Sequence, residues 1–64
     1  MNKEQAQEEY LKLLAEKVKE EDRIMEEAKA QGKWKPGLDS NRGLFTELNQ
    51  EFQKKIELLK SMVD

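Results

Sequence analysis

The sequence predicts an all-α fold, an antiparallel two-helix hairpin, from three observations. A stretch without glycine or proline covers residues 3–31, a cluster of turn-forming residues follows, and a second such stretch runs from residue 44 to residue 63. Glu, Lys, Ala, Gln and Leu dominate the first stretch, and these residues have high helix propensities. We expect a single domain over residues 1–64, with a first helix at about 3–31, a loop at 32–39 and a second helix at about 40–62.

Residues between the two stretches mark where each helix ends. Gly32 is a candidate for the left-handed position that closes a helix, and Pro36 prevents any continuation of the first helix. Asp39, Ser40 and Asn41 carry short side-chain oxygens that can accept from the free amides of a first helical turn. We favour Asp39 or Ser40 as the N-cap of the second helix.

Each predicted helix carries an apolar stripe at helical spacing. Folding back about the loop places Glu21 beside Phe52 and Val18 beside Ile56. The first nine residues extend beyond the second helix in this register, so we expect them to fray. The stripe of the first helix contains Tyr10, Leu13, Leu14, Val18, Ile24, Met25 and Ala28, and that of the second contains Phe45, Leu48, Phe52, Ile56, Leu59 and Val63.

The stripes are wider than one partner helix can cover, because a two-helix contact needs only a narrow seam. A chain of 64 residues also has little core of its own, and it has no cysteine for disulfides. We therefore expect the hairpin to pair into a four-helix bundle homodimer. The candidate oligomer face is Leu11, Leu13, Lys17, Glu21, Leu44, Phe52, Leu58 and Met62.

Lys17 and Glu21 interrupt the stripe of the first helix. In one interpretation their stems lie along the apolar edge and carry the charges out to water. In the other they form a semi-buried polar layer that sets the register or the oligomeric state. Both interpretations stay open at this stage.

The loop contains the only tryptophan, Trp34, between Lys33 and Lys35. Trp34 and Leu38 can fold back as a lid over the end of the hairpin. Alternatively an exposed Trp34 among cations can anchor a protein partner or stack on single-stranded nucleic acid. The lid would cover Ala28, Leu44 and Leu48, and the candidate partner-binding loop is Lys33, Trp34, Lys35, Leu38 and Arg42.

Composition limits the possible functions. The chain has neither His nor Cys, which removes the usual proton shuttle and the usual metal ligands, so we expect no enzyme, cofactor or metal site. With 12 basic and 14 acidic residues and no long apolar run, nucleic acid is a disfavoured partner and a membrane is not expected. We expect a cytoplasmic, non-enzymatic protein–protein interaction or regulatory module that binds a second copy or a larger protein. The alternative is a small nucleic-acid-associated factor that uses the Trp34 loop.

Overall fold

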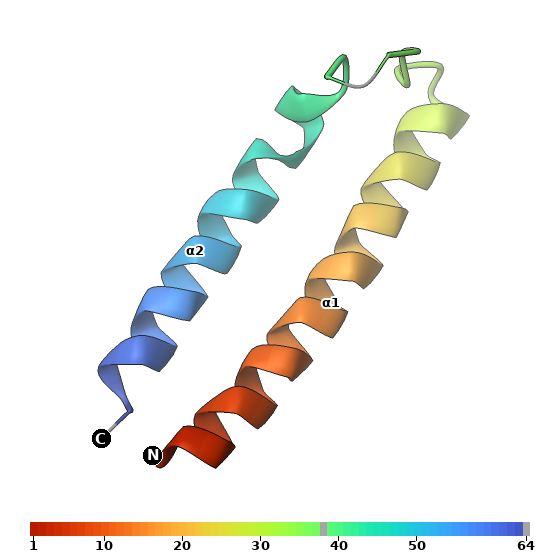
Figure 1. The fold of residues 1–64 in the computed structure, drawn as a ribbon. Coiled ribbons are helices and arrows are strands. Elements are labelled where there is room, and N and C mark those ends of the chain that lie inside the picture. Colours follow the sequence, from red (N-terminus) through yellow and green to blue (C-terminus); the bar gives the residue numbers. More distant parts are fainter. Residues whose placement is uncertain (38, 64) are drawn as a thin grey trace.

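The computed structural model describes residues 1–37 and 39–63, and in them the chain forms an antiparallel helical hairpin (Figure 1). Helix α1 spans Lys3–Ala30, a 3₁₀ helix η1 spans Arg42–Phe45, and helix α2 spans Thr46–Ser61. The two ends of the chain lie side by side at the end opposite the loop (Figure 1), where the amino terminus of Met1 donates to the Met62 carbonyl at 2.9 Å. The predicted all-α hairpin is confirmed for the described residues.

Helix α1 begins with a capping box that the sequence prediction missed. The Asn2 side chain accepts from the Gln5 amide at 2.8 Å, and the Gln5 side chain accepts from the Asn2 amide at 3.2 Å. These reciprocal bonds satisfy two amides that a helix start otherwise leaves unpaired. The first nine residues, which we expected to fray, are therefore helical from Lys3 onward.

Helix α1 ends in a Schellman motif built on Gly32. Gly32 has φ +70°, and its amide donates to the Lys29 carbonyl at 3.1 Å. The Lys33 amide donates to the Ala28 carbonyl at 2.8 Å, which completes the paired bonds of the motif. The prediction that Gly32 closes the helix is confirmed, because the motif requires a residue that adopts positive φ without strain.

The predicted N-cap of the second helix is wrong. The second helical segment begins at Arg42 as the 3₁₀ helix η1, and no side chain caps it. Ser40 donates its hydroxyl to the Pro36 carbonyl at 2.7 Å, and Asp39 pairs with the Arg42 guanidinium at 3.3 Å. Both favoured capping oxygens are thus used inside the loop.

Asn41 holds the loop together. Its side chain is buried and forms two hydrogen bonds with the backbone of Lys35, accepting from the amide at 2.9 Å and donating to the carbonyl at 2.8 Å. A primary amide can pair with both groups of one peptide position at once, whereas a carboxylate cannot donate. Asn41 therefore links the segment that follows α1 to the segment that precedes η1.

The register between the helices differs from the prediction by one turn. The Lys17 ammonium lies 4.9 Å from the centre of the Phe52 ring, the place where we expected Glu21. The cause is the path of the chain after the loop. A 3₁₀ helix rises about 2.0 Å per residue against about 1.5 Å in an α-helix, so the four residues of η1 contribute about 2 Å of this shift of about 6 Å.

Little of the predicted core is fully buried. Among the described apolar residues only Ala28 and Leu59 are buried, and no large side chain is fully enclosed. Two residues of the predicted α1 stripe, Tyr10 and Val18, are exposed, Val18 by 55%. This part of the prediction is wrong because α2 is a single helix and covers only the middle of a wide stripe.

We expect Asn41→Ala to destabilise the hairpin by about 1–3 kcal/mol, because it leaves the Lys35 amide and carbonyl without their partner. Asn49→Ala is the matched control, since Asn49 is exposed on α2 and alanine is the better helix former there. Urea unfolding followed by circular dichroism at one fixed protein concentration measures both. Equal midpoints for the two variants would contradict the bracing role of Asn41.

Candidate interaction surfaces

Trp34 packs at the loop end of the hairpin. Its ring is half-buried and meets the Phe45 ring edge to face, with centroids 6.3 Å apart and an angle of 86° between the ring planes. The Trp34 amide donates to the Ala28 carbonyl at 3.3 Å, and the Lys29 ammonium lies 5.9 Å from the indole ring centre. Edge-to-face packing of this kind stabilises aromatic pairs beyond the burial of their surface.

This arrangement agrees with a lid, although its contacts differ from the expected ones. Ala28 is buried and Leu48 is half-buried, but Leu44 stays exposed, and Phe45 of η1 supplies the aromatic contact. The predicted role of Leu38 lies outside the described residues. The lid forms because η1 turns Phe45 towards the loop.

The cations of the candidate partner-binding loop do not form one platform with Trp34. Lys33, Lys35 and Arg42 are exposed. The Arg42 guanidinium pairs with the Asp39 carboxylate at 3.3 Å, and the indole is partly covered by Phe45. The loop therefore offers exposed lysines beside a half-buried ring.

A groove of about 330 Å³ runs along one side of the helix pair. Lys17 is one of its lining residues, and the Lys17 ammonium stacks on the Phe52 ring. Both rims are charged, and Leu13, Leu48 and Phe52 give the groove apolar walls. The groove is lined by Leu13, Glu16, Lys17, Lys19, Glu20, Leu48, Glu51, Phe52 and Lys55.

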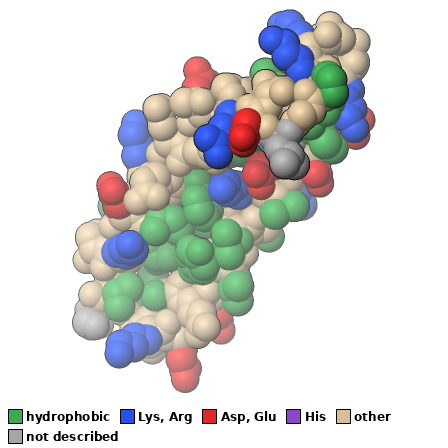
Figure 2. Space-filling view, turned by 45° about the horizontal axis from the view of Figure 1, so that its top comes forward, with side chains coloured by type: hydrophobic (Ala, Val, Ile, Leu, Met, Phe, Trp, Pro, Cys, Tyr) green, Lys and Arg blue, Asp and Glu red, His purple; other side chains and the backbone are tan. Residues whose placement is uncertain are grey.

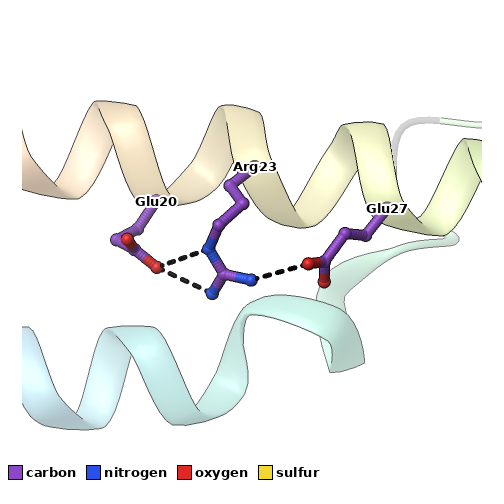
Figure 3. Close-up of polar contacts among 3 residues, drawn as sticks. All are labelled: Glu20, Arg23 and Glu27. Atoms are coloured by element: carbon purple, nitrogen blue, oxygen red, sulfur yellow. Dashed lines mark hydrogen bonds and ion pairs between the residues drawn. The ribbon is translucent and has the colours of Figure 1, made fainter.

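The α1 rim of the groove continues into an ion-pair cluster that Figure 3 shows in close-up. Arg23 donates to Glu20 at 2.7 and 3.0 Å and to Glu27 at 3.0 Å. The hydrogen bond and the negative charge of Glu20, followed by the charge of Glu27, raise the pKa of Arg23 above its ordinary value. The cluster is exposed, so it contributes to a solvated face rather than to the core.

The predicted oligomer face is divided between two sides of the hairpin. At about 100° per residue, Leu58 and Met62 lie on the groove side of α2, each seven residues after a groove residue, Glu51 and Lys55. Leu11 is on the other side of α1, about 140° around the helix from the groove residue Glu16. Of the predicted face, Leu11, Leu44, Leu58 and Met62 are exposed, whereas Leu13, Lys17, Glu21 and Phe52 are half-buried.

A second apolar surface lies on the side of α1 away from the groove, and the predicted face contained only Leu11 of it. We define the α1 seam as Leu11, Leu14, Val18 and Met25, residues that follow one flank of α1 away from the groove. Leu11 is 58% exposed and Val18 is 55% exposed, and Leu14 and Met25 are half-buried. Their 3-4-7 spacing was the available signal. Figure 2 shows hydrophobic side chains gathered into one area on the face that it presents.

No family model, curated protein or solved structure matches this chain. No helix in the described part of the chain is both long and apolar enough to cross a membrane. Residues 1–37 and 39–63 contain no group of three or more His, Cys, Asp or Glu side chains placed to hold a metal ion. The inference of function therefore depends on the apolar surfaces.

The fluorescence of Trp34 tests its packing, because it is the only indole. Phe45→Leu should shift the emission to longer wavelength and raise the rate of quenching by iodide, since the ring that covers the indole is lost. Phe52→Leu is the control, because Phe52 contacts Lys17 instead and lies along α2. An identical spectrum in both variants and in the native chain would contradict the lid.

Proposed function

We propose that this chain is a small non-enzymatic protein-interaction module that acts through helix packing and associates with a second copy of itself as a four-helix bundle. The supporting observation is its surface. The hairpin exposes 5371 Å², whereas a compact monomer of 7.6 kDa exposes about 4,300 Å². The excess of about 1,100 Å² exceeds the roughly 800 Å² that each partner buries in a standard interface.

The shape of the chain has the same cause. Its radius of gyration is 14.7 Å and its extents are 46 × 17 × 15 Å, whereas a compact domain of this length has a radius of gyration of about 10.7 Å. Two helices side by side form a rod with apolar flanks on both sides. A second hairpin would cover one flank and complete a bundle.

Apolar exposure supplies the driving force for association. Burial of apolar surface contributes about 25 cal/mol per Å², so covering several leucine-sized side chains offsets part of the entropy lost on association. The large apolar residues that are exposed are Tyr10, Leu11, Val18, Leu44, Leu58 and Met62. We propose the cytoplasm as the setting, and a larger protein as a further partner of the same surfaces.

The nucleic-acid alternative has less support from the loop. A base-stacking site needs an open aromatic face, and the Trp34 ring is half-buried against Phe45. The phosphate-binding groups would be Lys33 and Lys35, since Arg42 already pairs with Asp39. Acidic side chains outnumber basic ones in the whole chain, 14 to 12, which weakens attraction to phosphate.

Sedimentation equilibrium tests the proposal. We expect a mass twice the 7.6 kDa of one chain, and a melting temperature that rises with protein concentration, because dissociation and unfolding are linked. A constant mass of one chain, together with a cooperative melt that is independent of concentration, would contradict self-association.

A further inference from the structure

We propose that the second copy binds along the α1 seam, with its own α1 antiparallel, so that Leu14 of each copy packs against Met25 of the other. This inference rests on the proposed self-association and specifies its interface. It assigns the contact to the side of the hairpin opposite the groove. The two α1 helices then lie at the centre of the bundle contact, and the α2 helices lie outside it.

The spacing of the α1 seam fits a helix partner. Leu11, Val18 and Met25 occupy a positions of a heptad repeat, and Leu14 occupies a d position. The remaining d position, between Val18 and Met25, is Glu21. The seam from Leu11 to Met25 is about 21 Å long at about 1.5 Å per residue. Leu11 and Val18 are more than half exposed in the single hairpin, so this repeat is without a partner helix there.

The single polar place, Glu21, decides between the two directions of packing. In a parallel pair Glu21 of one copy would face Glu21 of the other, and like charges at a half-buried position repel. In an antiparallel pair a positions meet d positions, so Glu21 faces Val18 of the second copy, next to the two-fold axis. The half-buried carboxylate therefore favours the antiparallel direction.

Charges beside the α1 seam are complementary in the same antiparallel register. Glu4 and Glu8 are exposed near the start of α1, and Lys29 and Lys33 are exposed near its end. When Leu14 packs against Met25 of the second copy, the e places bring Glu8 next to Lys29, once on each side of the two-fold axis. In a parallel pair Glu8 and Lys29 would lie at opposite ends of the contact and could not meet.

The other apolar flank offers a poorer match. Leu58 and Met62 lie close to the carboxyl end of α2, and the preceding positions on that side are the charged groove residues Glu51 and Lys55. A partner helix along this side would desolvate Glu51 and Lys55. The α1 seam has only one ionisable residue among its heptad positions from 11 to 25.

Cysteine cross-linking tests the seam and its direction, because the native chain has no cysteine. Leu14→Cys and Met25→Cys chains, unfolded together under reduction, refolded and oxidised, should form the mixed disulfide dimer. Each variant alone should stay uncross-linked, because its cysteines lie on opposite sides of the two-fold axis, too far apart for a disulfide. Mass spectrometry distinguishes the mixed dimer from the two symmetric ones. Leu58→Cys is the exposed control and should also stay uncross-linked.

A charge substitution provides an independent measurement. Val18→Glu should raise the dimer dissociation constant at least about 100-fold, because both copies lose a buried side chain and place a carboxylate against Glu21 of the other copy. Leu58→Glu should change it less than about threefold. Val18 and Leu58 are similarly exposed in the single hairpin. Circular dichroism should show equal helicity in the two variants, so that a higher dissociation constant reports weaker association and not loss of the helices.

The outcomes separate this inference from the proposed function. A dimer that survives Val18→Glu and dissociates with Leu58→Glu would overturn the seam and leave self-association standing. Symmetric disulfide dimers of either variant alone would overturn the antiparallel direction. A native chain with the mass of a monomer at every concentration would overturn both, and would assign the exposed seam to a foreign helix.

Discussion

A helix that meets only one other helix can bury one narrow stripe, and this limit governs the whole molecule. Apolar residues cover more of α1 than that, so the contact with α2 uses Leu13, Lys17 and Ile24 and leaves Leu11 and Val18 in solvent. The hairpin then has almost no interior. Only Ala28 and Leu59 are buried among the apolar residues described, so burial in the single hairpin contributes little to the stability of this 64-residue chain.

The loop determines how the two helices face each other. Gly32 ends α1, Asn41 ties Lys35 to the second half of the turn, and η1 extends the chain before α2 begins. Phe52 meets Lys17 instead of Glu21. A lysine can occupy this place since its ammonium stacks on the ring while its stem stays between the helices. Glu21 is thereby turned towards the side that carries the α1 seam.

The two sides of the hairpin consequently differ in chemistry. The groove side holds the charged rims and the Arg23 cluster with Glu20 and Glu27, all of which water solvates well. The opposite side holds the α1 seam with one carboxylate. Another helical surface can cover the seam side without desolvating the ion pairs of the groove side, and this difference underlies the inference about the interface.

The sequence by itself determined the two helices, the turn at Gly32 and the excess of apolar surface, because propensity, glycine conformation and heptad spacing are local properties. The capping box at Asn2 could also have been predicted, because an asparagine followed three residues later by a glutamine is a sequence signature of this motif. Tertiary structure alone decided the register and the use of Asp39 and Ser40 within the loop, because both depend on how η1 and Asn41 close the turn. It also decided which apolar residues share a side, since this depends on which part of the wide α1 stripe the single helix α2 covers.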